Sequence, residues 1–219
     1  MSYPGRPVNQ SITSMKIIAN MKDEFRELYD IPEDHQSVGV ITSDYPDILH
    51  CAVDDATKKT QIKVISCDTY YGGASVKWSA NSGSAFAIIS GAKVADVNSA
   101  MRSIEDYVKR QRFLYDLKGD GSLLYFVGLI SPAGKYFQEE LEVTGNDALA
   151  YVAGPPVEAM YAIDQALKGG DVKVAEFAAP PDFDNCARAI LVGNESACKN
   201  ALMAFAQAME LTGRDPVKI

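Results

Sequence analysis

A seven-residue stretch that decides the fold occurs twice in this chain. Residues 52–58 read AVDDATK, and residues 162–168, 110 positions later, read AIDQALK. The match runs on from residues 62–64 (IKV) to residues 172–174 (VKV) at the same spacing. Similar segments at a constant spacing are the signature of a duplicated structural unit, so we expect two halves of similar fold.

A second pair of segments supports the duplication. Residues 85–91 read AFAIISG, and residues 187–193 read ARAILVG, now 102 positions later. The spacing is shorter because residues 65–84 connect in the first half what residues 175–186 connect in the second. Both segments are apolar runs that end at glycine, a pattern typical of buried strands.

Weaker matches complete the pattern. Residues 15–19 correspond to 125–129, and residues 37–41 correspond to 148–152. Each half then reads strand, short helix, strand, helix, strand, strand, helix. Strands mixed with amphipathic helices favour a two-layer sandwich of the α/β (α+β) class in each half.

The boundary between the halves is predicted in the polar, turn-rich residues 112–121. We therefore expect one domain over residues 1–113 and a second over residues 114–219. At 219 residues, the chain is long enough for two domains of this size.

Helices are predicted after each glycine-terminated strand and after each proline near the start of a repeated segment. Pro46 and residues 155–156 stand where helices favour proline. The other helix of each half carries one apolar stripe. The stripe of the first half is Val94, Val97, Met101, Ile104 and Val108. The stripe of the second half is Ala197, Ala201, Phe205, Ala208 and Met209.

Composition excludes several classes of function. The formal charge is -8 and the pI is near 4.8, which disfavours contacts with nucleic acid or anionic lipid. The sequence has no apolar run of membrane-spanning length, and residues 1–10 lack the apolar core of a signal peptide, so we expect a cytoplasmic protein. Four cysteines without a CxxC pair, and only two histidines, predict buried thiols and no metal site.

Motifs of catalysis are missing as well. The sequence contains no GxGxxG, GxxxxGK[ST] or GxSxG motif. The Gly169–Gly170 pair follows a predicted helix, where glycine ends helices, so it does not indicate a phosphate loop. We expect neither an enzyme nor a bound cofactor.

One connection stands out by its composition. Residues 70–78 hold two tyrosines, two glycines and a tryptophan, and the shorter residues 178–185 occupy the same place in the second half. Such a segment is either a surface loop with packed aromatic side chains or a loop that lines a channel.

Acidic residues cluster at the predicted ends of elements: Asp44, Asp47, Glu158 and Asp184. Carboxylates favour the starts of helices, which alone explains Asp47 and Glu158. Gathered at a seam between subunits, the same carboxylates would instead attract a small cation. The sequence leaves both interpretations open.

The repeated segments carry a family resemblance. Residues 154–168 (GPPVEAMYAIDQALK), 54–58, 71–74 (YGGA) and 196–199 (SACK) closely resemble tandem-domain bacterial microcompartment shell proteins of the ethanolamine-utilisation EutL type. The similarity extends from about residue 11 to residue 216.

The resemblance implies a structural shell protein with two circularly permuted domains. It also implies that three chains form a pseudohexameric tile, which joins other shell proteins in a microcompartment shell inside the cytoplasm. Loops around the tile's axis open and close a central pore in this family. The matching positions are Tyr70, Tyr71, Gly72, Gly73, Ala74, Pro180, Pro181 and Asp182.

The resemblance further implies three small acidic pores per trimer that can hold ethanolamine. The matching positions are Asp47, Ser84, Phe113, Glu158, Phe183, Asp184 and Asn185. This sequence departs from the family pattern, which has carboxylates where Pro46 and Ser84 stand. Losing two carboxylates weakens the attraction for an ammonium group, although Asp184 compensates in part. The metabolite is then ethanolamine or another small alcohol or aldehyde.

Two rival functions remain open. A trimeric sensor domain that binds a small metabolite in a cleft between subunits would share the α/β sandwich architecture. It predicts tight ligand binding and no assembly into sheets. The other alternative is an enzyme, and turnover of a substrate by the purified protein would reveal it.

Overall fold

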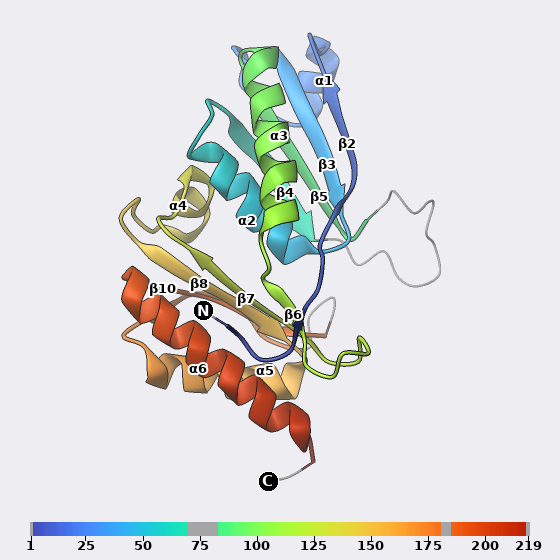
Figure 1. Ribbon diagram of the computed structural model, residues 1–219. Helices are drawn as coiled ribbons and strands as arrows, with labels where there is room; N and C mark the ends of the chain where they lie inside the picture. The colour runs from blue at the N-terminus through green and yellow to red at the C-terminus, as the bar shows by residue number, and fades with distance from the viewer. Residues whose placement is uncertain (1, 70–82, 181–184, 218–219) are drawn as a thin grey trace. The chain divides into compact units, whose positions relative to one another are not determined.

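The computed structural model describes residues 2–69, 83–180 and 185–217 (Figure 1). The candidate pore positions Tyr70–Ala74 and 181–184 lie outside these ranges. The chain divides into two compact units. Unit 1 holds residues 1–9, 112–133 and 137–219, and unit 2 holds residues 10–111 together with Gly134–Tyr136.

Unit 2 contains an antiparallel sheet in the strand order β2-β3-β5-β4. Its elements are β2 (Ile12–Ile18), α1 (Asp23–Leu28), β3 (Ser37–Ser43), α2 (Pro46–Thr57), β4 (Lys63–Thr69), β5 (Ala85–Gly91) and α3 (Val94–Arg110). Helices α2 and α3 contact each other and pack on the sheet. Proline at the first position of α2 fits the missing backbone N–H, as predicted.

Unit 1 contains an antiparallel sheet in the order β1-β6-β7-β8-β10-β9. Its strands are β1 (Arg6–Pro7), β6 (Leu114–Asp116), β7 (Leu124–Ile130), β8 (Ala148–Gly154), β9 (Lys173–Ala178) and β10 (Ala187–Gly193). Its helices are α4 (Lys135–Leu141, of which the first two residues belong to unit 2), α5 (Pro156–Gly169) and α6 (Glu195–Arg214). Helices α5 and α6 lie side by side on one face of the sheet (Figure 1).

The predicted duplication is confirmed by strand order. The order β7-β8-β10-β9 in unit 1 repeats β2-β3-β5-β4 in unit 2, and the helices follow in the same sequence. Within the described ranges, β1 and β6 add to the sheet of unit 1 and have no counterpart in unit 2.

The segment predicted as a polar linker is partly a strand. β6 occupies its first part, and the turn after it is held by Asp116, which is only 6% exposed. Its carboxylate accepts hydrogen bonds from the backbone N–H groups of Lys118, Gly119 and Gly121 at 2.8–3.1 Å. The polar residues seen in the sequence therefore form a tight turn between two paired strands.

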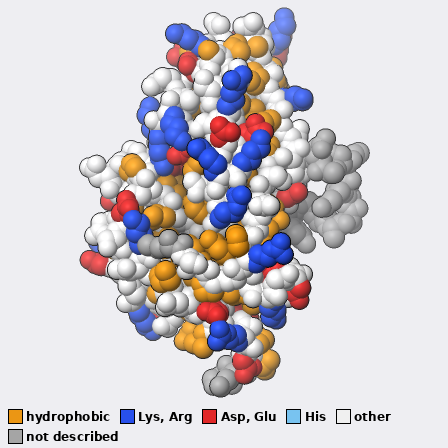
Figure 2. Space-filling model, viewed as in Figure 1, with side chains coloured by type: hydrophobic (Ala, Val, Ile, Leu, Met, Phe, Trp, Pro, Cys, Tyr) orange, Lys and Arg blue, Asp and Glu red, His pale blue; other side chains and the backbone are white. Residues whose placement is uncertain are grey.

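The predicted helix stripes form the cores of both units. Four residues of the α3 stripe are buried, whereas Val94, the first residue of the helix, is 40% exposed. All residues predicted for the α6 stripe are buried. Over α3, Lys and Arg alternate with Asp and Glu at the surface (Figure 2). In the part of the chain that the structure describes, no helix combines the length and apolarity needed to cross a membrane.

Three of the cysteines are buried as predicted, and Cys186 is half-buried. Burial raises the pKa of the Cys198 thiol to about 11 and that of Cys51 well above its ordinary value. Both thiols are therefore protonated at neutral pH and pack as small hydrophobic groups.

Candidate functional site

One end of the sheet in unit 2 is organised around Ser43, the last residue of β3. The Ser43 hydroxyl donates to Ser11 O at 3.1 Å, and the Tyr45 N–H donates to the same hydroxyl oxygen at 3.2 Å. The Ser84 N–H donates to the Ser43 carbonyl oxygen at 2.7 Å. Gly83 adopts φ +65°, and a Cβ there would lie 2.7 Å from that carbonyl. The close approach thus requires glycine.

This arrangement brings Asp47 and Ser84 to the same end of the sheet. Asp47 lies in the first turn of α2 and Ser84 directly precedes β5, and both are half-buried. A half-buried carboxylate and a half-buried hydroxyl at the same end of a sheet offer acceptors to a small cationic or hydroxylated molecule. The positive end of the α2 dipole stabilises the Asp47 carboxylate where it stands.

Unit 1 repeats the arrangement at the corresponding end of its sheet. β8 ends at Gly154, which pairs with Ala187 at the start of β10. Glu158 lies half-buried in the first turn of α5, and Asn185 lies exposed two residues before β10 with φ +52°. Glu158 and Asn185 therefore flank the same sheet end, and Pro180 lies half-buried just after β9.

Phe113 occupies a different place. Its ring packs edge-on against Phe126, with ring centroids 5.7 Å apart, and covers Gly128, where a Cβ would lie 3.0 Å from the ring. Phe126 points away from the core that α5 and α6 share with Tyr125 and Val127. Phe113 thus lies on the sheet face opposite the helix that carries Glu158.

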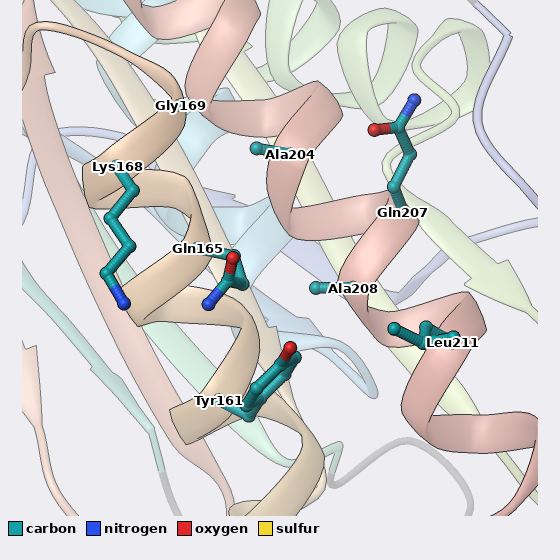
Figure 3. Close-up of a pocket in the computed structure, with 8 residues that line it drawn as sticks. All are labelled: Tyr161, Gln165, Lys168, Gly169, Ala204, Gln207, Ala208 and Leu211. Atoms are coloured by element: carbon teal, nitrogen blue, oxygen red, sulfur yellow. The ribbon is translucent and has the colours of Figure 1, made fainter.

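A groove that the sequence did not reveal runs between α5 and α6 (Figure 3). Tyr161, Gln165 and Lys168 line it from α5, and small residues such as Ala204 leave room on α6. It continues at Tyr161 and Leu211 into a second hollow that includes Glu158. Hydrophobic side chains reach the surface around the C-terminal end of α6 (Figure 2), where Leu211 is 64% exposed. The sequence contains one sign of this groove: Leu211 is a large apolar residue of α6 that lies outside the predicted apolar stripe of that helix.

The remaining candidate positions lie outside the described residues: Tyr70, Tyr71, Gly72, Gly73, Ala74, Pro181, Asp182, Phe183 and Asp184. Over the ranges that the structure covers, no three His, Cys, Asp or Glu side chains come together as metal ligands would.

Comparison with known proteins defines the class. A family model described as the BMC domain matches residues 37–117. The chain is similar to the bacterial microcompartment shell protein EutL of Clostridium perfringens, with 34% identity over 96% of this chain and 97% of that protein. EutL of Escherichia coli is 29% identical over 96% of both chains. The duplicated fold is thus that of bacterial microcompartment shell proteins.

A solved structure narrows this class. The crystal structure of the ethanolamine utilization protein EutL from Leptotrichia buccalis superposes with a TM-score of 0.93 and 32% identity, covering 99% of this chain and 100% of that chain. The chain belongs to the EutL family of bacterial microcompartment shell proteins.

Proposed function

We propose that this protein is a non-catalytic building block of a bacterial microcompartment shell, in which three chains close into a six-sided tile. Two relatives, at 34% and 29% identity, are named as shell proteins. The observation that carries the trimer is the repeated strand order of the two units. A ring with six equivalent domain positions closes with three chains when each chain supplies two domains.

The domains of the proposed tile are residues 1–113 and 114–219, each circularly permuted. The match to the BMC domain begins at residue 37, the start of β3, and leaves out β2 and α1. This is expected if β2 and α1 have moved from the end of the domain to its beginning. A permutation of this kind would account for the start of the match at residue 37.

The trimer has a direct test in solution. Light scattering coupled to size exclusion should give a mass three times the 23.7 kDa of the chain. Electron microscopy of concentrated protein should then show flat sheets of tiles, because shell subunits associate through their edges. A stable monomer at micromolar concentration would contradict the tile. A trimer that binds a metabolite tightly and never forms sheets would favour a sensor domain.

The tile is proposed to carry a gated central pore and small pores that accept a small polar metabolite. The central pore would be lined by residues 70–74 and 180–182, which match the pore loops of the family. The half-buried carboxylates of Asp47 and Glu158, at corresponding sheet ends, support the small pores. EutL of Leptotrichia buccalis is described as an ethanolamine utilization protein, so ethanolamine is the first metabolite to test.

The double variant Asp47→Asn/Glu158→Gln should weaken ethanolamine binding about tenfold or more, because a hydrogen bond to a charged group contributes about 1.5–3 kcal/mol. Isothermal titration of the assembled protein with ethanolamine measures the loss. Asp164→Asn, which removes a carboxylate farther along α5, is not a fair control because it also changes the exposed face that Met160, Asp164 and Leu167 form on α5. Glu105→Gln on α3 serves instead and should leave the affinity unchanged. Equal affinities for all three proteins would exclude these carboxylates from the site.

A further inference from the structure

The repeated helices α2 and α5 differ in what covers their outer faces. At the 110-residue spacing, Asp54 corresponds to Asp164 and Thr57 to Leu167. Asp54 is fully buried and Thr57 is 4% exposed. By contrast, the side chain of Asp164 is 54% exposed and Leu167 is 36% exposed. The outer face of α2 is therefore covered by other residues, whereas the corresponding face of α5 is exposed to solvent.

The cover on α2 consists of Gly134–Tyr136. The Gly134 N–H donates to the Asp54 carboxylate at 2.9 Å, and the Lys135 N–H donates to the Thr57 hydroxyl oxygen at 2.9 Å. The Tyr136 hydroxyl lies 2.9 Å from Nδ1 of His50, and the two rings stack with centroids 6.0 Å apart. The start of α4 therefore closes the outer face of α2.

The same cover exists a second time in the chain. Helix α4 is the repeat of α1, and Phe137, 2% exposed, corresponds to Phe25, which packs on the core of unit 2. This alignment, 112 residues apart, makes residues 22–24 the counterparts of Gly134–Tyr136. Residues 22–24 are exposed within their unit. The open face of α5 and the unused cover are thus a complementary pair.

A second copy of the chain is the occupant that the repeat requires. In unit 2, the helix of the first repeat is covered by residues that open the short helix of the second repeat. If the same relation holds for the second repeat, its helix α5 is covered by the residues that open the short helix of the next repeat. The next repeat after the second is the first repeat of another chain, so these residues are 22–24 of that chain. Such a head-to-tail relation closes into a ring when the rotation permits.

We propose that residues 22–24 of a second copy cover the face of α5 formed by Met160, Asp164 and Leu167, with the Lys22 ammonium paired to the Asp164 carboxylate. This proposal rests on the proposed trimer and specifies which residues meet where two of its chains are in contact. Met160, 49% exposed, takes the place of His50 in this face.

The proposed contact between Lys22 and Asp164 follows from one difference between the two covering segments: Gly134 in one corresponds to Lys22 in the other. A Cβ on Gly134 would lie 2.4 Å from the Asp54 carbonyl oxygen, so the backbone there approaches α2 directly. Lys22 has a side chain, which holds its backbone farther from α5 and offers an ammonium group instead of an amide N–H. Asp54 pairs with Lys58 and still accepts the bond from Gly134. Asp164 pairs with Lys168 in the same way and keeps acceptor capacity for Lys22.

Charge reversal tests the pair in the full-length protein. Asp164→Lys and Lys22→Asp should each raise the dissociation constant of the assembly about tenfold or more, because each places like charges in contact. The double variant Asp164→Lys/Lys22→Asp should restore assembly. Sedimentation velocity over a range of concentrations measures all three, and circular dichroism confirms that each chain is folded. Lys109→Asp, which reverses an exposed charge on α3, is the matched control and should assemble as the parent does.

Cross-linking shows whether the contact joins different chains. Chains carrying Lys22→Cys are co-expressed with chains carrying Asp164→Cys and then oxidised. A disulfide-linked pair of chains should form only when both variants are present, because the two Cα atoms must lie within about 7 Å. If the parent protein is trimeric but neither the reversals nor the cross-link has an effect, this interface is wrong while the trimer stands. If the parent is monomeric, the proposed tile itself fails. Loss of assembly that the double variant does not restore would refute the pairing of Lys22 with Asp164.

Discussion

Replacing Asp54 with alanine is expected to lower the free energy of unfolding by about 2–4 kcal/mol. The carboxylate is fully buried, pairs with Lys58 at 3.1 Å and accepts the Gly134 N–H. Alanine leaves that buried N–H without its partner and opens a cavity. Lys58 is itself 22% exposed and regains water, so the loss comes chiefly from the amide and the cavity. Urea unfolding followed by circular dichroism measures the change.

The control for this variant is Glu105→Ala on α3. Glu105 also pairs with a lysine four residues later, but its side chain is 41% exposed. An exposed pair of this kind contributes little to stability, so this substitution should cost far less than Asp54→Ala. If both substitutions cost the same, the burial of Asp54 would have no energetic weight, and the closed face of α2 would be a packing feature without consequence for stability.

Phe205→Ala should cost about 3–5 kcal/mol, as expected for truncating a fully buried aromatic side chain. Phe205 is fully buried in the core between α6 and the sheet, with its ring 6.4 Å from that of Tyr125. Truncation removes the ring and leaves a cavity that neighbouring alanines are too short to fill. Thermal unfolding of both proteins at equal concentration measures the loss.

Leu211→Ala provides the comparison on the same helix. Leu211 is 64% exposed, so its truncation should change stability by less than about 0.5 kcal/mol. Similar losses for the two variants would mean that the apolar stripe of α6 does not face the core. The pair thus tests the predicted stripe as well as the position of the helix.

The duplication and the element order were predictable because the repeated segments are long and apolar. Residues 85–91 and 187–193 are central strands in their sheets, where continuous apolar runs bounded by glycine are expected. The strands β1 and β6 escaped prediction because they are short and carry polar residues. Arg6 pairs with Asp116, and a pairing over that distance in sequence leaves no local pattern.

The candidate site was predictable only in part. The prolines that open α2 and α5 locate Asp47 and Glu158 in first helical turns, which a local signal can indicate. Nothing local distinguishes Asp54 from Asp164, since both stand in nearly the same seven residues. Their different exposure depends on Gly134, which lies 80 residues from Asp54. Such differences arise from tertiary contacts rather than from the helix sequence itself.

The pairing of β1 with β6 has a consequence for the order in which the chain folds during synthesis. Residues 2–9 are translated long before β6 and β7, yet Arg6 lies opposite Asp116 in the paired strands β1 and β6, and Tyr125 donates a hydrogen bond to the Pro4 carbonyl oxygen at 2.6 Å. These residues must wait until Tyr125 has been translated, while β2 to α3 can form their sheet earlier. A bulky fusion placed ahead of Pro4 would therefore hinder the pairing of β1 with β6 at this edge of the sheet.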